Sequence, residues 1–496
     1  MSIKQLFAKK WAKRVVNSTN KWAQNPIATQ EKVLKMLLQK AKKTAFGQDH
    51  GFAQIENYED FAKQVPIRDY EGLRPYVDRV VAGEADILWP GKPRYFSKTS
   101  GTTSGVKYIP ISKESMPTHI KTAQNALFHY IHHSGNTSFV DGKMIFLQGS
   151  PILSKTNGID TGRLSGIVAH YIPSYLQKNR MPSWQTNCID DWEQKVDAIV
   201  EETHDQDMRL ISGIPPWVKM YFERLRAKTN QPIKDIFPNF SLFVYGGVNY
   251  APYRLILEEL TGKKIDSVEL YPASEGFIAF QDHPDENGML LQLDAGIFYE
   301  FVEADKIHEE NPLRVSLAAV KKGVNYAIIL NTSAGLWGYN IGDTVSFVNL
   351  KPYRIIVTGR IKHFISAFGE HVIGKEVEQA MEETLQVHDA RVTEFTVAPQ
   401  VTPEAGLPHH EWWVAFDSAP EDLATFAKTL DLSMRKQNTY YDDLIKGGVL
   451  CPLVIKPLPT GAFEQYMKKI GKLGGQNKTP RLTNDRKIAE ALNKQF

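Results

Sequence analysis

Cysteine is scarce in this sequence, with only Cys188 and Cys451 among 496 residues. Two thiols cannot build a disulfide-stapled scaffold or a zinc site of four thiolates, so both are excluded. Apolar runs of about 18 residues are also missing, which excludes a membrane-spanning helix. The formal net charge is only +3, too small to indicate a nucleic-acid groove. These absences predict a protein of the reducing cytoplasm, without a membrane span or a nucleic-acid partner.

Several catalytic motifs are missing as well. The sequence has no G-x-S-x-G, H-E-x-x-H, G-x-G-x-x-G or G-x-x-x-x-G-K-[ST] motif, which argues against the enzyme classes that depend on them. His129, His132 and His133 share one face of a predicted helix and could in principle hold a metal ion. Because no matching carboxylate or cysteine set accompanies them, we expect a polar helix face.

The first 30 residues contain basic side chains but no acidic one. Such a segment is typical of an organelle transit peptide, of a membrane-surface helix, or of a solvated helix packed on the main body. No secretory apolar region or small-residue cleavage site follows, so we expect the packed helix, with an apolar stripe toward the main body. The basic residues are Lys4, Lys9, Lys10, Lys13, Arg14 and Lys21, and the predicted stripe is Ile3, Phe7, Trp11 and Val15.

The length of the chain exceeds the size at which one hydrophobic core stops growing, so we expect at least two domains. Short apolar runs alternate with longer helical patterns, which predicts an α/β fold with mixed β-sheets layered with helices. A helix is expected over 30–45, ended by Gly47, and a loop-rich stretch over 85–110. Further strands are predicted at 144–148, 242–245, 267–270, 296–302, 326–331, 344–348 and 354–358, and further helices at 190–204, 216–229 and 251–261.

The pattern changes after Arg360. Helices are predicted at 375–385 and 420–437, and strands near 394–397, 411–416 and 450–456. About 130 residues of this kind fit a compact α+β unit. We therefore predict two domains, a large one over 1–360 and a small C-terminal one over 361–496.

The most informative segment of the sequence runs from Ser97 to Pro110. Its glycines free backbone N–H groups, its hydroxyls add donors and its lysine adds a cation, a combination that would cradle a polyphosphate. Composition alone leaves a plain linker open, because many linkers are rich in Gly, Ser and Thr. The residues concerned are Ser100, Gly101, Thr102, Thr103, Ser104, Gly105 and Lys107.

The order T-S-G-T-T-x-G-x-K resembles the phosphate loop of the adenylate-forming superfamily, which includes acyl-CoA synthetases, peptide-synthetase adenylation domains and luciferases. Ser104 stands where a glycine often follows the paired threonines, and no proline precedes Lys107. Those departures, with the Ile-Pro that follows, are similar to the Gretchen Hagen family of auxin-responsive acyl acid–amido synthetases. The resemblance extends from about Phe46 to Arg481, nearly the whole chain.

Two further motifs follow in the family's order. Residues 243–248 end a predicted strand in a Gly-Gly turn and resemble the segment that flanks adenine, while Tyr271-Pro-Ala-Ser-Glu275 resembles the family's Y-x-x-S-E. Taken alone, the first is an ordinary turn and Glu275 could be an acid at a helix N-terminus. The resemblance implies Gly246, Gly247, Val248 and Tyr271 beside adenine, Ser274 at phosphate and Glu275 as a Mg²⁺ ligand.

Near the predicted domain boundary, Tyr339-Asn-Ile-Gly-Asp343 resembles Y-R-x-G-D, which implies that Asp343 accepts hydrogen bonds from the ribose hydroxyls. Asn340 replaces the usual arginine, so that arginine's role does not carry over. Thr358-Gly-Arg360 resembles the motif that closes the large domain, with Arg360 near ribose. The resemblance also implies a hinge at Ile361 and Lys362.

Gly474-Gly-Gln-Asn-Lys-Thr-Pro-Arg481 resembles the family's Q-x-K-x-P-R, which places Lys478 where the family has the mobile lysine of its small domain. By position alone, this lysine would be a solvated residue near a chain end. The resemblance implies that Lys478 faces the charge that develops at the α-phosphate of ATP.

The acyl pocket is less well defined by the sequence. We expect an apolar pocket with a few polar groups. Aromatic residues over 119–175 and the segment 214–217 are candidates for its wall. The turn-rich stretch 211–217 could equally serve as the cap of the helix that follows it.

The resemblance as a whole implies an enzyme that uses ATP and Mg²⁺. It would convert a small carboxylic acid to an acyl-adenylate and transfer the acyl group to an amino acid, with the small domain acting as a lid. Two alternatives stay open, an acyl-CoA ligase with a thiol acceptor and a non-catalytic nucleotide-binding protein. The acid and the amino acid are not defined by the sequence.

Overall fold

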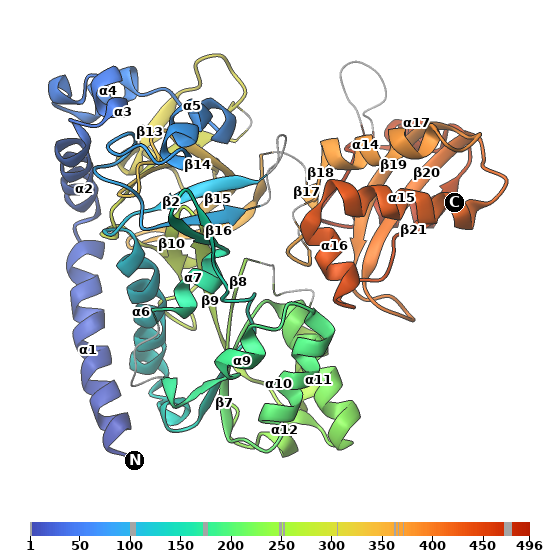
Figure 1. Ribbon diagram of the computed structural model, residues 1–496, viewed down its shortest axis with the longest axis horizontal. Coiled ribbons are helices and arrows are strands. Elements are labelled where there is room, and N and C mark those ends of the chain that lie inside the picture. The colour runs from blue at the N-terminus through green and yellow to red at the C-terminus, as the bar shows by residue number, and fades with distance from the viewer. Residues whose placement is uncertain are drawn as a thin grey trace.

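The structure is a computed structural model that describes residues 2–99, 106–171, 177–247, 250, 253–304, 306–361, 364–365, 367–370, 372–470 and 479–496. Figure 1 shows a large N-terminal part and a smaller C-terminal part beside it. The helices before residue 362 are α1 (Ile3–Ala23), α2 (Pro26–Ala41), α3 (Ala45–Asp49), α4 (Tyr58–Gln64), α5 (Tyr70–Val81), α6 (Met116–Ser134), α7 (Leu164–Ala169), α9 (Trp184–Asn187), α10 (Trp192–Thr203), α11 (Pro215–Thr229), α12 (Ile233–Ile236) and α13 (Arg254–Thr261).

A twelve-stranded mixed sheet forms the centre of the large part. Its strands β6, β3, β7, β8 and β9 run parallel, and the remaining pairs are antiparallel. In sheet order the strands are β13 (Arg314–Ser316), β12 (Ile297–Glu303), β14 (Asn325–Thr332), β15 (Tyr339–Leu350), β16 (Tyr353–Arg360), β11 (Met289–Leu291), β10 (Gly276–Phe280), β9 (Asp266–Ala273), β8 (Leu242–Gly246), β7 (Met208–Ser212), β3 (Lys143–Phe146) and β6 (Arg180–Met181).

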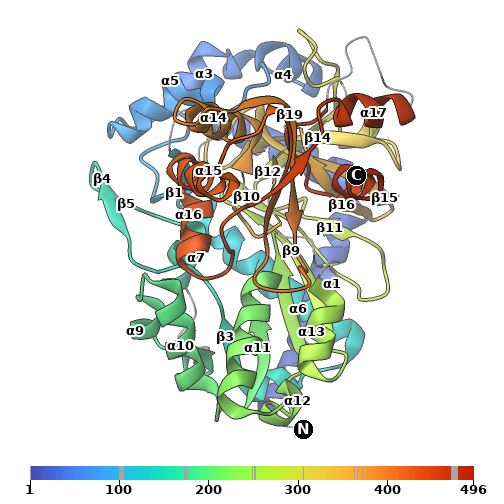
Figure 2. The ribbon, with the colours of Figure 1, turned by 90° about the vertical axis from the view of Figure 1, so that its right-hand side faces the viewer.

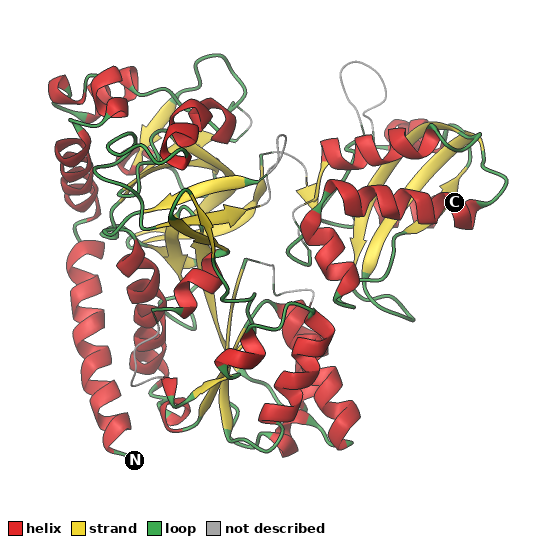
Figure 3. Cartoon of the chain, viewed as in Figure 1, coloured by secondary structure: helices red, strands yellow, loops and turns green. Residues whose placement is uncertain are grey.

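Helices cover both faces of the parallel strands, as Figures 1 and 3 show. Successive side chains of a strand point to opposite faces, so neighbouring residues of β3 and β7 belong to different cores. Met144 and Leu210 pack in the cluster that includes α1 and α6, whereas Ile145 and Ile211 pack with α10, α11 and α13. The expected α/β fold with mixed, helix-layered sheets is confirmed.

A four-stranded sheet lies apart from the central one, in the order β2 (Lys107–Ile111), β1 (Tyr95–Thr99), β5 (Ile159–Gly162) and β4 (Ser154–Thr156). The predicted loop-rich stretch over 85–110 is confirmed for residues 85–94, but the prediction missed the strands β1 and β2. Phe96, Ile109 and Ile111 of these strands are fully buried.

The strands after β16 form separate sheets. One has two strands, β17 (Phe364–Ile365) and β18 (Val372–Ile373), and the other has three, β19 (Arg391–Gln400), β20 (His409–Ser418) and β21 (Val454–Leu458). Helices cover both faces of the three-stranded sheet. These helices are α14 (Gly374–Leu385), α15 (Leu423–Gln437), α16 (Thr439–Lys446), α17 (Ala462–Lys469) and α18 (Lys487–Gln495). Trp412 packs with α14, α15 and α16 on one face, and Trp413 packs with α17 and α18 on the other. We refer to residues 361–496 as the small domain, which remains our proposed division.

The small domain contacts the large one through α11 and the residue before α13. The Tyr253 hydroxyl donates to the Ala367 oxygen at 2.8 Å. A Cβ added at Gly369 would lie 3.5 Å from the Ile214 side chain. Figure 2, turned so that the small domain faces the viewer, shows α11 and α13 below it. Buried apolar side chains form one continuous cluster across this junction.

Helix α1 does not pack as predicted. Its buried side chains are Ala12, Val16, Thr19 and Trp22, whereas the residues of the predicted stripe face solvent or are only partly buried. The helix has apolar residues on two faces, and the small residues of the second face allow the close approach to α6 seen in Figure 1. Among the described residues, no helix is both long and apolar enough to cross a bilayer.

Two other local predictions are wrong. The second helix ends at Ala41, and Gly47 lies inside α3, which the Thr44 side chain caps by accepting from Gly47 N–H. The three-histidine face of α6 is only partly polar. His129 is 2% exposed, contacts the Thr19 hydroxyl at 3.0 Å, and burial lowers its pKa to about 4. No set of three metal-binding side chains occurs in the described part of the chain.

Candidate active site

The carboxyl ends of β8 and β9 place several predicted site residues at one edge of the central sheet. The two strands are parallel, with Gly246 opposite Leu270. Gly246 and Gly247 therefore end β8 beside the end of β9, which carries Tyr271, and Ser274 and Glu275 follow in the turn before β10. In open α/β sheets, this edge is where ligands bind.

The backbone at the end of β8 needs glycine. A Cβ at Gly246 would lie 2.3 Å from the Leu270 oxygen, so a side chain there would push the strands apart. Gly247 has φ +76°, in the left-handed region that favours glycine. Both residues thus leave a side-chain-free surface, and Gly247 lines the large cavity described below. Val248 lies outside the described residues.

Tyr271 and Asp343 meet at this edge from strands far apart in the sequence. The Tyr271 hydroxyl donates to Asp343 Oδ2 at 2.5 Å, and both side chains are buried. Asp343 is held by an unusual backbone turn, since Gly342 has φ +89° and its N–H donates to Asn340 Oδ1 at 2.9 Å. The two motifs predicted to hold adenine and ribose therefore share a hydrogen bond.

Asp343 also lies opposite Arg360 in the β15–β16 pair. Ile361 N–H then donates to the Gly342 oxygen at 2.8 Å, so the start of the predicted hinge is attached to the Asp343 turn. Lys362, the second predicted hinge residue, lies outside the described residues.

The predicted phosphate loop is bracketed by β1 and β2. Thr99 pairs with Lys107 at the open end of this hairpin, and Ser100 to Gly105 lie outside the described residues. Ser97, fully buried on β1, shares a hydrogen bond of 2.8 Å with Ser274. This contact joins the strand that leads into the loop to the turn that carries Glu275. Lys107 Nζ lies 5.4 Å from the centre of the Tyr70 ring.

Lys478 and the residues from 471 onward that precede it lie outside the described residues. The residues after it are tied to the small domain. The Arg481 oxygen accepts from Val397 N–H at 2.9 Å, and the Arg481 guanidinium lies 4.7 Å from the centre of the Phe395 ring. Arg481 Nε also donates to Glu378 at 2.9 Å.

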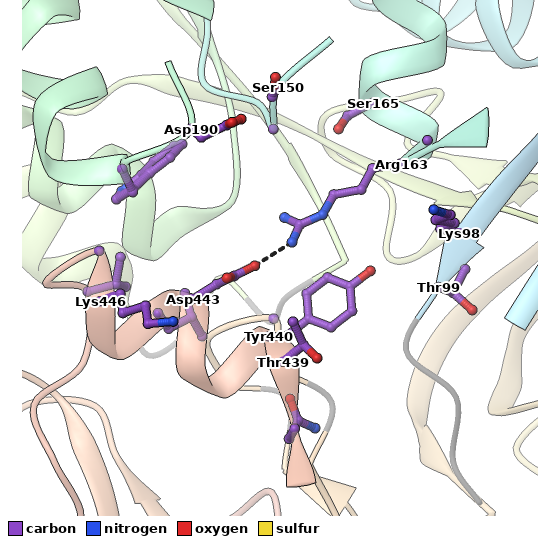
Figure 4. A pocket seen from close by; sticks show the side chains of 18 of the residues that line it. Lys98, Thr99, Ser150, Arg163, Ser165, Asp190, Thr439, Tyr440, Asp443 and Lys446 are labelled. Carbon is purple, nitrogen blue, oxygen red and sulfur yellow. Dashed lines mark hydrogen bonds and ion pairs between the residues drawn. The ribbon is translucent and has the colours of Figure 1, made fainter. Parts of the chain in front are cut away.

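A cavity of about 1040 Å³ lies between the two domains (Figure 4). Thr99 and Val106, the residues next to the predicted phosphate loop, line one part of it, and Ile214 and Trp217 line another. Ile214 is also the cap residue of α11, so the turn at 211–217 both walls the cavity and begins the helix. The described aromatic residues over 119–171 do not line this cavity, and their place in an acyl pocket stays a prediction.

An ion pair crosses the cavity. Arg163 of the large domain donates to Asp443 of α16 at 2.6 Å, and its guanidinium lies 4.7 Å from the centre of the Tyr440 ring. Figure 4 shows this contact between the two walls. Both side chains are 40% or more exposed, so the pair contributes little to stability.

Lys195 of α10, which was not predicted from the sequence, lines the same cavity. The Lys195 side chain is only 2% exposed, and desolvation lowers its pKa to about 8. The helix pattern held a weak signal, because Lys195 lies on the buried side of α10 with Val196 and Ile199. Trp192, one turn earlier, also lines the cavity.

Three family models match this chain. The model described as the GH3 family N-terminal domain matches residues 15–188, the central domain matches 290–360, and the C-terminal domain matches 375–487. The chain belongs to the GH3 family. The predicted phosphate loop falls in the first match and Asp343 in the second, which confirms the predicted resemblance.

Curated GH3 relatives align along almost the whole chain. Indole-3-acetic acid-amido synthetase GH3.15 of Arabidopsis thaliana is 24% identical, covering 93% of this chain and 92% of that protein. Jasmonoyl–L-amino acid synthetase JAR4 of Nicotiana attenuata is 22% identical, covering 91% of this chain and 90% of that protein.

Solved structures share the fold. The AtGH3.15 acyl acid amido synthetase in complex with 2,4-DB has a TM-score of 0.61 at 19% identity, covering 97% of this chain and 96% of that one. 2-Hydroxyisobutyryl-CoA ligase with 2-HIB-AMP and CoA has a TM-score of 0.57 at 14% identity, covering 93% and 91%. One of these neighbours is named as an amide-forming enzyme and the other as a thioester-forming enzyme. The fold alone therefore does not define the acceptor.

Proposed function

We propose that this protein is an ATP-dependent acyl acid–amido synthetase. It activates a small carboxylic acid as an acyl-adenylate and transfers the acyl group to an amino acid, with AMP and pyrophosphate as products. The observation that carries the proposal is the Tyr271–Asp343 contact at the sheet edge, because it brings the adenine and ribose motifs together in a GH3 chain. Relatives aligned over nine-tenths of the chain are named amido synthetases, which supports the acceptor class.

These contacts define the end of the proposed site that binds the nucleoside, which we call the nucleoside end. Tyr271 donates to one oxygen of the Asp343 carboxylate, and the same carboxylate accepts hydrogen bonds from the ribose hydroxyls. Gly246 and Gly247 offer backbone rather than side chains, which allows a flat base to lie close to the strand ends. Val248 and Arg360 complete this part of the proposed site.

The phosphate end is the loop over 100–105 with Lys107 and Ser274. Glu275 fits a magnesium ion, because Mg²⁺ in nucleotide sites is held by one or two carboxylates together with phosphate oxygens and water. The lack of a three-ligand protein cluster in the described residues agrees with such a site, where the nucleotide supplies the other ligands. When bound, Mg²⁺ neutralises charge on the phosphates.

The reaction needs positioning more than covalent chemistry from the protein. A carboxylate oxygen of the acid attacks the α-phosphorus, and the bond from that phosphorus to pyrophosphate breaks. The amine nitrogen of the amino acid then attacks the acyl carbon, AMP leaves, and the amine loses a proton. Lys478 and Lys107 oppose the negative charge that develops at the phosphates. The hinge at Ile361 and Lys362 lets the small domain move between the two half-reactions.

Pyrophosphate release tests the proposal. Wild-type protein is incubated with Mg·ATP, a panel of small carboxylic acids, and either amino acids, CoA or no acceptor. Turnover that needs both an acid and an amino acid supports the proposal. Turnover that needs CoA indicates an acyl-CoA ligase instead, and nucleotide binding without any pyrophosphate release across the panel indicates a non-catalytic protein. A cytoplasmic location remains a prediction.

A further inference from the structure

The cavity wall holds a buried cation without an anionic partner. Lys195 Nζ lies 3.4 Å from the Gln148 backbone oxygen and 5.9 Å from the centre of the Trp192 ring. No carboxylate in the described part of the chain forms an ion pair with it within 4.0 Å. The negative charge of Asp190 raises the Lys195 pKa. Desolvation has a larger, opposite effect and keeps this pKa below its ordinary value.

Two neutral donors of the same cavity wall also lack acceptors. The indole N–H groups of Trp192 and Trp217 are buried without a hydrogen-bond partner among the described residues. The two indole rings lie 4.3 Å apart, and both line the cavity with Lys195. Three polar groups with unused donors, Lys195 and the two indoles, therefore lie together at one wall.

Buried polar groups without acceptors destabilise the folded protein when no ligand fills the cavity. A buried donor without an acceptor loses its hydration and gains nothing in return, and a buried charge loses more. Proteins keep such groups mainly where a ligand supplies the missing partner. A carboxylate fits this wall, because it offers about four acceptor lone pairs and the opposite charge.

We propose that Lys195, Trp192 and Trp217 form a subsite for a substrate carboxylate other than the one that is adenylated. Two substrates can supply this group, the carboxylate of the amino-acid acceptor or a second carboxylate at the far end of the acid. The identity of these substrates rests on the proposed function. The subsite lies near the end of β3, three strands or roughly 14 Å along the sheet edge from β9 at the usual strand spacing, so it is distinct from the Tyr271–Asp343 end.

The test compares ligands that differ only in this carboxylate. L-phenylalanine is compared with L-phenylalaninamide as acceptor, and adipate with hexanoate as acid, by direct calorimetric binding and by KM. The variants are Lys195→Met, Lys195→Gln and Lys195→Arg. Lys219→Met is the control, because this partly buried lysine of the next helix is paired with Glu223 at 2.8 Å.

In the wild type, one ligand pair shows preference for the carboxylate form, and Lys195→Met or Lys195→Gln lowers that preference about 10- to 100-fold. Lys195→Arg retains part of it, and the control retains all of it. Loss with the amide pair assigns the acceptor, and loss with the adipate pair assigns the acid. The Lys195→Met protein melts at the same temperature or higher, a result that a structural lysine would not give.

Unchanged preferences in folded Lys195→Met and Lys195→Gln would overturn the subsite even if turnover continues. The proposed function fails separately, when the wild type releases no pyrophosphate with any acid. In that case, Lys195-dependent binding of L-phenylalanine or adipate in the calorimeter still upholds the subsite.

A different observation concerns the outer face of α1. Four large apolar side chains of its first half are exposed, with Ile3 at 73%, Phe7 at 71%, and Leu6 and Trp11 at 53% each. Six basic residues of the same helix are also exposed, and the helix has no acidic residue. The opposite face packs on α6, so the apolar residues point away from the molecule.

We infer that this face of α1 binds the surface of a membrane that contains anionic lipids. Aromatic and aliphatic side chains flanked by lysine and arginine are typical of helices that lie in the interface. A second copy of the chain is disfavoured as occupant, because two such faces would bring together two sets of cations. The Ser2 hydroxyl and the Gln5 amide donate to Asp141 at 2.8 and 2.7 Å, which holds the helix start to the body.

Sedimentation with vesicles tests this inference. We expect binding to phosphatidylcholine vesicles that contain phosphatidylserine, much weaker binding to phosphatidylcholine alone, and weakening by salt. Phe7→Ser with Trp11→Ser lowers binding about 10-fold or more, whereas the control Leu313→Ser, at a residue 76% exposed elsewhere, has no effect. No binding to the mixed vesicles, or equal binding by the double variant, overturns it. So does light scattering that shows a dimer which the double variant dissociates.

Discussion

The two ends of the proposed site satisfy their polar groups differently. At the nucleoside end, Tyr271 bonds to Asp343 and Ser97 bonds to Ser274, so the protein itself orients the groups. At the far end of the cavity, Lys195 contacts only a backbone oxygen, and the indole N–H groups of Trp192 and Trp217 have no acceptor among the described residues. The first arrangement is preorganised for one constant ligand, and the second is completed by a ligand that can vary between enzymes of one fold.

The largest effect is expected at Lys478. Lys478→Ala should lower adenylation about 10²- to 10³-fold, since a group that opposes transition-state charge contributes on that scale. Transfer from a preformed acyl-adenylate should fall much less. Rapid-quench measurement of the two half-reactions checks this, with Lys469→Ala as control. Equal losses in both half-reactions would remove Lys478 from the adenylation step.

Asp343 should show the next largest effect. Asp343→Ala deletes the acceptor for ribose and also the hydrogen bond from the buried Tyr271 hydroxyl, so KM for ATP should rise about 10- to 100-fold. The matched control is Asp266→Ala, which removes the acceptor of a similar bond, from Tyr130 at 2.7 Å, at the other end of β9. If both variants changed KM for ATP alike, the contact would be structural only.

Because Lys195 is buried, we predict that the free energy of unfolding changes with pH. Desolvation lowers its folded pKa to about 8, with Asp190 and Cys188 opposing the shift and Arg163 adding to it. Below pH 8 the folded protein holds a buried charge, and this cost disappears as pH rises from about 8 toward the unfolded value. Wild type should therefore gain about 1–3 kcal/mol relative to Lys195→Met between pH 7 and pH 10. Urea unfolding of both proteins at these two pH values checks this, and parallel pH profiles would contradict it.

The smallest effect is expected for the ion pair between the domains. Arg163 and Asp443 are both substantially exposed, so breaking the pair should change stability by less than about 1 kcal/mol. Because the pair joins the domains, the acyl-transfer rate should change a few-fold. A double-mutant cycle with Arg163→Ala and Asp443→Ala measures the coupling. Additive effects on transfer would show that the pair does not couple the domains.

The same comparison explains what the sequence could predict. Tyr271, Ser274 and Asp343 could be found because the backbone around them is demanding, as Gly246 and Gly342 show, and such demands leave motifs. Lys195 gave only a weak signal, because a lysine on an amphipathic helix is normally solvated and its burial here depends on tertiary packing.

Local patterns failed where two structures compete for the same residues. Strands β1 and β2 were missed because the polar, glycine-rich loop between them dominates the composition. The apolar stripe of α1 was predicted to face inward because its side chains are large. The structure instead buries Ala12 and Val16, whose smaller side chains allow close helix packing. In both cases tertiary packing decides the structure, and the periodicity of the sequence carries no information about that packing.

Single-turnover acyl transfer tests the central claim most directly. Wild-type protein is loaded with Mg·ATP and an acid that it activates, freed of excess ATP, and mixed with an amino acid or with CoA while the products are followed by mass. The account predicts an N-acyl amino acid, with AMP formed in equal amount and no reaction with CoA. An acyl-CoA product, with no amide formed, would contradict it.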